Sequence, residues 1–139
     1  MSSLKTELLK AIKECAYSSE EEGGIIFEKN GQYKFVYLKN DFAGTPTAAA
    51  LISFRGDFGK AVTVMDEGWL SFASFHIHPS FSPMYSSIDY SKLFQSFKTN
   101  YIYSNMSGEL AKYEWKGEKV INKYTLTIKE LTKLKNGQS

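Results

Sequence analysis

The chain has 139 residues, which suits one ordinary domain, and its 42% hydrophobic and 23% charged content excludes a disordered tail. A net charge of +2 gives no basic footprint for nucleic acid, and no apolar run approaches the roughly 20 residues of a membrane-spanning helix. The first residues lack a secretory signal, and the single cysteine, Cys15, cannot form an internal disulfide. We therefore expect one soluble domain over residues 1–139, cytoplasmic or exported without a conventional signal peptide.

The N-terminal part of the chain predicts a helix followed by a β-hairpin. Apolar residues recur at helical spacing from residue 4 to about residue 17. The pair Gly23-Gly24 then interrupts the chain. Residues 25–27 and 33–38 indicate two strands, and Asn30-Gly31 between them suits a tight primed turn.

The middle of the chain is less regular until a strand at residues 71–78. Residues 40–46 and 56–59 are typical of a loop and a turn. The apolar residues 48–54 between them fit either a short strand or a buried helical turn, because such a short run has no decisive period. The strand at residues 71–78 is expected to end at Pro79.

A second helix and three closing strands are predicted for the rest of the chain. After a loop at residues 79–85, residues 87–98 place apolar side chains at i, i+3, i+4 and i+7, which indicates a helix. Three strands are expected at residues 101–104, 110–115 and 120–128, and a frayed helix from Lys129 onward. This order predicts an α/β domain with a mixed sheet, flanked by the N-terminal helix and by the helix after the loop.

The two histidines of the chain, His76 and His78, are separated by one residue within the predicted strand. Residues i and i+2 of a strand project from the same face, so both imidazoles are expected to point to one spot. That arrangement suits a shared metal ion. The alternative is two polar side chains on a solvated strand face.

Carboxylates near the histidines in the predicted fold extend this pattern. Asp89 lies in the first turn of the helix after the loop, and two imidazoles with one carboxylate and an open fourth position are typical of catalytic zinc. A charge at a helix terminus is the alternative role of Asp89. Hydrolysis also needs a base, for which Glu20, Glu21 and Glu22 are candidates, although such an acidic run also fits a solvated surface.

Three segments together resemble the motif of the JAMM (JAB/MPN+) zinc metalloproteases. They are Glu-Glu-Gly-Gly-Ile-Ile at 21–26, His-Ile-His-Pro at 76–79 and Ser-Ser-Ile-Asp at 86–89. In that family a glutamate precedes a small-residue strand, and His-x-His is followed after seven residues by Ser-x-x-Asp. The same spacing occurs here. The short chain is most similar to bacterial JAB-type domains, including toxin-associated ones.

The resemblance implies a cytidine-deaminase-like, JAMM-type fold and a set of roles. His76, His78 and Asp89 would bind Zn²⁺, with water as the fourth ligand, and Glu21 would be the general base. Ser86 would polarise the scissile carbonyl, although an N-cap role fits it equally well. The implied reaction is hydrolysis of a peptide or isopeptide bond in a peptide, protein or ubiquitin-like substrate.

Other functions are constrained by the same residues. A catalytically silent binding module of this fold usually lacks a metal ligand, whereas the complete set occurs here. A zinc deaminase needs a Pro-Cys-x-x-Cys pair, which a single cysteine excludes. Glutamates interleave with the lysines of residues 109–123, which disfavours a nucleic-acid surface. Ile77 departs from the small polar residue usual between the histidines, and it is expected to pack on the opposite face of the sheet.

Overall fold

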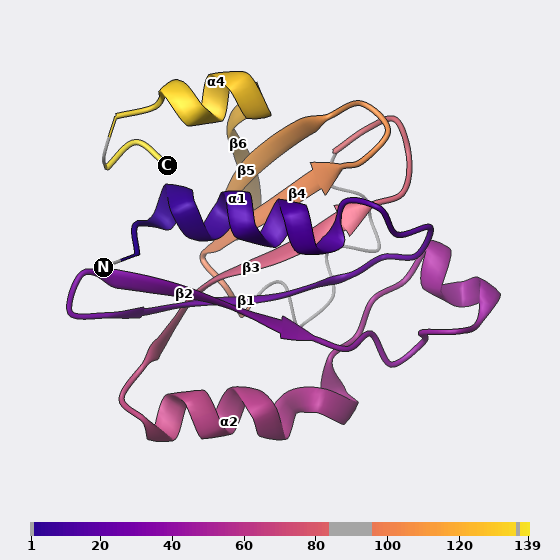
Figure 1. The fold of residues 1–139 in the computed structure, drawn as a ribbon, viewed down its shortest axis with the longest axis horizontal. Helices are drawn as coiled ribbons and strands as arrows, with labels where there is room; N and C mark the ends of the chain where they lie inside the picture. The colour runs from indigo at the N-terminus through magenta and orange to yellow at the C-terminus, as the bar shows by residue number, and fades with distance from the viewer. Residues whose placement is uncertain (1, 84–95, 136) are drawn as a thin grey trace.

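Six strands form one mixed sheet in the computed structural model, which describes residues 2–83, 96–135 and 137–139 (Figure 1). They are β1 (Gly23–Lys29), β2 (Gln32–Leu38), β3 (Leu70–His78), β4 (Thr99–Ser104), β5 (Glu109–Lys116) and β6 (Lys119–Thr127). Their order in the sheet is β2-β1-β3-β4-β5-β6, with β3 and β4 parallel and the other neighbouring pairs antiparallel. The prediction of an α/β domain with a mixed sheet is confirmed.

Helices cover both faces of this sheet. In Figure 1, α1 (Leu4–Cys15) lies across one face and α2 (Phe58–Asp66) across the other, while α4 (Ile128–Lys133) lies near α1. Two short 3₁₀ helices, η1 (Pro46–Ala49) and η2 (Arg55–Asp57), lie between β2 and α2. Successive side chains of β1 point to opposite faces of the sheet and so belong to two different cores. Ile26 packs in the core between the sheet and α1 (the α1 core), whereas Phe27 packs in the core between the sheet and α2 (the α2 core).

The N-terminal predictions are confirmed with small shifts in boundaries. The Ser3 hydroxyl caps α1 by accepting the backbone N–H of Thr6 at 3.1 Å. The helix ends at Cys15, two residues before the predicted end. The hairpin turn has positive φ at both Asn30 (51°) and Gly31 (77°), as a primed turn requires.

The segment between β2 and β3 differs from the prediction. Residues 48–54 form neither a strand nor a complete helical turn, since η1 covers only their beginning and an irregular stretch follows. The turn expected at residues 56–59 instead holds the end of η2 and the start of α2. Burial of Ala61 and Val64 against the sheet explains the helix, because tertiary packing outweighs a weak local signal.

The C-terminal part also changes two boundaries. The helix predicted at residues 87–98 falls mostly outside the described residues, and residues 96–98 are not helical. Strand β4 begins at Thr99, earlier than expected, because it pairs there with Ala73 of β3. The helix predicted from Lys129 onward is observed as α4, which begins with a reciprocal capping box between Thr127 and Glu130 and ends at Lys133.

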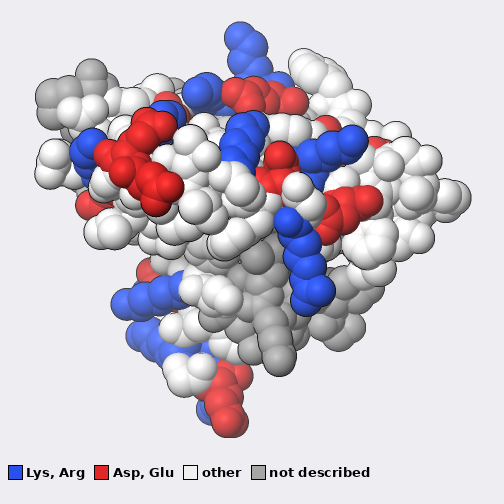
Figure 2. Space-filling model, turned by 90° about the horizontal axis from the view of Figure 1, so that it is seen from below, with Lys and Arg blue, Asp and Glu red and all other residues white. Residues whose placement is uncertain are grey.

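Charged side chains are interspersed on the molecule. Figure 2 shows acidic and basic groups intermixed over much of the face seen from below, as the small net charge leads one to expect. Within the described ranges, none of the helices has both the length and the apolar character needed to cross a membrane.

Candidate metal centre

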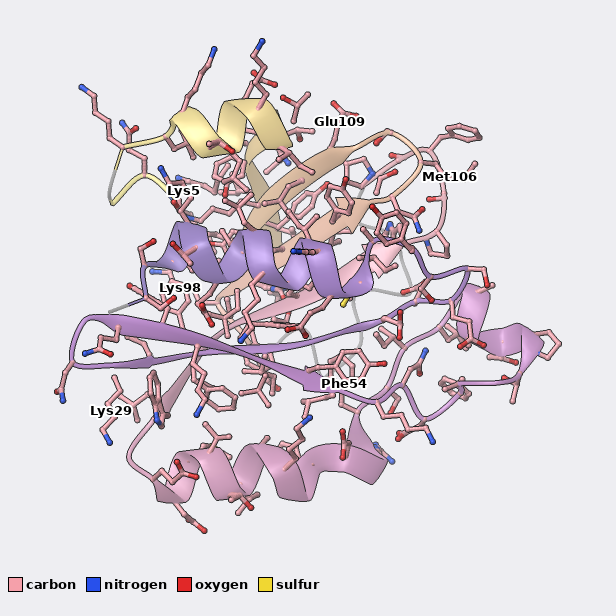
Figure 3. All side chains as sticks on the ribbon, viewed as in Figure 1. Lys5, Lys29, Phe54, Lys98, Met106 and Glu109 are labelled. Atoms are coloured by element: carbon pink, nitrogen blue, oxygen red, sulfur yellow. The ribbon has the colours of Figure 1, made fainter. Side chains whose placement is uncertain are left out.

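The two histidines lie at the carboxyl end of β3, in the interior of the sheet. His76 is opposite Gly23 of β1 and beside Ile102 of β4, and His78 is beside Ser104 of β4. His76 is fully buried and His78 is 8% exposed. In Figure 3, Met106 lies near this end of the sheet, whereas Lys29 lies at the opposite end, beside the β1–β2 hairpin.

The imidazole rings of His76 and His78 approach each other with their Nε2 atoms. Their Nε2 atoms are 3.2 Å apart, and the ring centroids are separated by 5.0 Å at an interplanar angle of 60°. Two nitrogens that bind one tetrahedral zinc at 2.0–2.1 Å are about 3.3 Å apart. The pair therefore has the spacing that a shared metal needs. Ile77 between them is buried in the α1 core, so the prediction that it occupies the opposite face is confirmed.

Glu21 joins the histidines from the segment before β1. One ligand atom from each of Glu21, His76 and His78 lies within 4.8 Å of the others, and all three residues are buried. The carboxylate Oε1 of Glu21 is 3.8 Å from His76 Nε2. The backbone of Glu21 is held on both sides, because its N–H donates to the Ala48 carbonyl at 2.6 Å and its carbonyl accepts from Asn40 Nδ2 at 3.0 Å. Sequence reasoning missed the roles of Ala48 and Asn40.

The other two acidic residues of the run lie elsewhere. Glu22 accepts the Tyr37 hydroxyl at 2.6 Å, and Glu20 accepts the backbone N–H of Gly44 at 2.9 Å. Burial and then the hydrogen bond to Glu22 raise the pKa of Tyr37 above its usual range. Burial, with Glu22 second, likewise raises the pKa of the Cys15 thiol to about 12, so this cysteine is neutral near pH 7. Glu21 is thus the member of the run that lies beside the histidines.

The glycine pair allows the backbone of β1 to pass close to both of its neighbours. A Cβ atom at Gly24 would lie 2.0 Å from the Val36 carbonyl oxygen of β2, and one at Gly23 would meet the backbone of β3. Only glycine permits approaches of this kind. The glycine pair thus lets β1 pack closely against β2 and β3 beside the site.

His78 has a further contact that the sequence did not indicate. Its Nδ1 atom is 3.2 Å from the backbone carbonyl oxygen of Ser82, in the loop that follows β3. A backbone carbonyl carries no residue-type signal, so no motif reveals this contact. Two predicted site residues, Ser86 and Asp89, lie outside the described residues, and their expected roles stay predictions.

Comparisons with known proteins found a solved structure with a similar fold. No protein-family model matches the chain, and no curated protein matches its sequence. The solution structure of protein DSY2949 from Desulfitobacterium hafniense is similar, with a TM-score of 0.58 and 16% sequence identity over 87% of each chain. At this identity the likeness supports a shared fold and carries no information on activity.

Proposed function

We propose that this protein is a JAMM-like zinc metallopeptidase that hydrolyses a peptide or isopeptide bond in a peptide, protein or ubiquitin-like substrate. The observation that carries the proposal is the buried convergence of His76, His78 and Glu21 at one end of the sheet. The match to the JAMM spacing in residues 21–89 supports the family and a cytidine-deaminase-like, JAMM-type fold.

Burial makes this cluster unlike an ordinary group of polar side chains. Removing imidazole and carboxylate groups from water costs free energy unless a partner compensates them. Here the cluster occupies an interior strand end, where apolar side chains would pack at no such cost. A cation bound by the two imidazoles, with the Glu21 carboxylate beside it, offsets the cost, and clusters of this kind concentrate at functional sites.

The donor set fits zinc rather than a harder cation. Imidazole nitrogen is a common zinc ligand, whereas calcium and magnesium prefer a set of oxygen atoms. His76 and His78 would hold the ion, with Asp89 as the third protein ligand by the motif match. Zinc bound there supplies a Lewis acid and lowers the pKa of water from 15.7 towards about 7.

In this proposal Glu21 performs the proton transfers. Its carboxylate accepts a proton from the attacking water and then delivers it to the leaving amine, which is general base and then general acid catalysis. Glu21 is buried and its carboxylate lies 3.8 Å from His76 Nε2, which suits that role. Little bulk water reaches the carboxylate there to compete with the reacting groups for its hydrogen bonds. The backbone bonds to Ala48 and Asn40 keep the carboxylate in place.

The proposal is tested with tag-free protein by elemental analysis and by hydrolysis assays. We expect about one zinc per chain, removal by a chelator, and restored binding when zinc is added back. Cleavage is assayed on peptide libraries and ubiquitin-like fusions, with His78→Ala as the matched inactive chain. Circular dichroism of that variant verifies that it folds.

Three outcomes separate the candidate functions. Zinc-dependent cleavage that is absent in His78→Ala supports the peptidase. Stoichiometric zinc without cleavage of any substrate indicates a binding module of the same fold. A folded wild-type chain that binds no zinc, or an His78→Ala variant that binds it equally well, removes the proposed function.

A further inference from the structure

Two buried side chains hold the loop that follows the metal-ligand candidates. The Ser104 hydroxyl of β4 donates to the Ser80 carbonyl, and the Tyr113 hydroxyl of β5 donates to the Pro83 carbonyl at 2.9 Å. Between these two anchors, the Ser82 carbonyl oxygen lies 3.2 Å from His78 Nδ1. The loop is therefore held on both sides of the carbonyl that faces His78.

That carbonyl decides which ring nitrogen of His78 carries the hydrogen. A carbonyl oxygen accepts hydrogen bonds and cannot donate them, so Nδ1 must be the N–H of the neutral ring. The lone pair of the ring then lies on Nε2, which is the atom that faces His76. In the metal-free chain the same logic gives His76 an Nε2–H, which donates to His78 Nε2 across 3.2 Å.

We propose that Ser104 and Tyr113 are positioning residues that hold the Ser82 carbonyl on His78 Nδ1 and so direct the Nε2 lone pair of His78 into the site. Ser104 is the neighbour of His78 in the sheet, but the hydroxyl groups of both residues donate to the loop rather than to the rings. The tautomer of His78 is inferred for the metal-free chain and does not depend on zinc. Its effect on zinc affinity rests on the proposed function.

The surroundings of both residues keep their hydroxyl groups in a fixed direction. Ser104 is fully buried, and its oxygen also accepts the backbone N–H of Ser107 at 3.2 Å, which leaves its hydrogen for the Ser80 carbonyl. The ring of Tyr113 packs in a small apolar cluster with Ile102 and Ala111. A hydroxyl on a rigid, buried ring holds its acceptor better than one on a mobile surface side chain.

The first measurement reads the tautomers directly. The chain has two histidines, so a long-range ¹H–¹⁵N spectrum of tag-free, metal-free protein contains two imidazole patterns, which a His76→Gln variant assigns. At a pH where both rings are neutral, we expect His78 as the Nδ1–H tautomer and His76 as the Nε2–H tautomer. A wild-type His78 in the Nε2–H form overturns the inference.

Variants then test the two positioning residues. Tyr113→Phe and Ser104→Ala each remove one hydroxyl, and we expect each to convert His78 into a mixture of tautomers. Tyr103→Phe is the matched control, because Tyr103 is also buried but packs in the core on the opposite face of the sheet. Wild-type tautomers in both test variants, or the same mixture in the control, contradict the assignment.

Zinc affinity, measured by competition with a chelator, tests the consequence for the metal. Groups that orient a ligating histidine typically change affinity by 10- to 100-fold. We expect weakening of that size in Tyr113→Phe and Ser104→Ala and none in Tyr103→Phe. If the tautomers shift as expected but the wild-type chain binds no zinc, the proposed function fails while the positioning roles stand. If the tautomers shift and zinc affinity does not, the positioning of the metal ligand is wrong.

Discussion

Gly23 of β1 lies directly opposite His76 of β3, at a distance that leaves no room for a side chain. A Cβ atom on Gly23 would lie 2.0 Å from the Phe75 carbonyl oxygen and 2.7 Å from the Cα atom of His76. This close approach sets the position of Glu21, two residues earlier in the chain. The glycine therefore links the fold of the sheet to the geometry of the candidate site.

Gly23→Ala is expected to destabilise the protein strongly, because backbone atoms must move to admit the methyl group. We expect the free energy of unfolding to fall by about 3 kcal/mol or more, and zinc binding to weaken in whatever fraction folds. Urea unfolding measures the first effect. Gly59→Ala is the control, because its Cβ position in α2 meets no described atom within 4 Å apart from its chain neighbours and the backbone of its own helix, and the change should stabilise by about 0.5 kcal/mol. Equal effects at both positions contradict the argument.

Glu21→Gln is expected to abolish most hydrolysis while zinc remains bound. Glutamine keeps the shape of the side chain but cannot accept the proton, and loss of a general base typically lowers the rate by a factor of about 100 to 10,000. Zinc content and turnover are measured on the same sample. Loss of zinc together with activity indicates instead that Glu21 is a metal ligand.

Glu22→Gln is the matched control for that change. Glu22 is next in sequence, but its carboxylate accepts the hydrogen bond of the Tyr37 hydroxyl. The side-chain amide of the glutamine variant keeps an oxygen that can accept the same bond. We expect turnover within about threefold of wild type, since the charge of Glu22 is not part of the site. A turnover loss as large as that of Glu21→Gln reverses the roles of the two residues.

Zinc is expected to raise the melting temperature, because an ion that binds the folded chain stabilises it by mass action. At a free zinc concentration 100 times the dissociation constant, the stabilisation is about 2.7 kcal/mol. A thermal scan with added zinc and with a chelator measures the difference. His76→Ala should show the same melting temperature in both conditions, and a zinc response that persists in this variant places the ion elsewhere.

Alkaline pH is expected to destabilise the fold partly through Cys15. Its folded pKa is raised from 9.0 to about 12, so the unfolded chain loses this proton first as the pH rises. The contribution is full below about pH 9 and is lost between pH 9 and 12, with a limiting slope of about 1.4 kcal/mol per pH unit. Urea unfolding from pH 8 to 10 measures it. Cys15→Ala should flatten the curve, and an unchanged slope shows that Cys15 does not contribute.

Local patterns were sufficient for the hairpin and for the central strand. Asn30-Gly31 specifies its own turn, because both residues accept positive φ, and the two flanking strands pair in register from Lys29 and Gln32. The same period of two puts His76 and His78 on one face of β3, whatever else the chain does. Such features depend only on residues near each other in the sequence.

Elements with weak local signals needed the tertiary structure. Residues 56–66 have no clear helical period, yet α2 forms there because Ala61 and Val64 are buried against β1 and β2. Strand β4 begins at Thr99 because β3 offers a partner at Ala73. Long-range contacts of this kind are stabilising only once the chain is folded, so no short window of sequence contains them.

The sequence alone determined the paired histidines, the acidic run and the glycines beside it. Tertiary structure decided that β1 lies next to β3, which brings Glu21 rather than Glu22 to the histidines. It also decided that Ser104 and Tyr113 hold the loop whose carbonyl meets His78. The reason is physical: alternation along a strand is local, whereas the order of strands and the partners of a loop follow from how the whole chain buries its apolar surface.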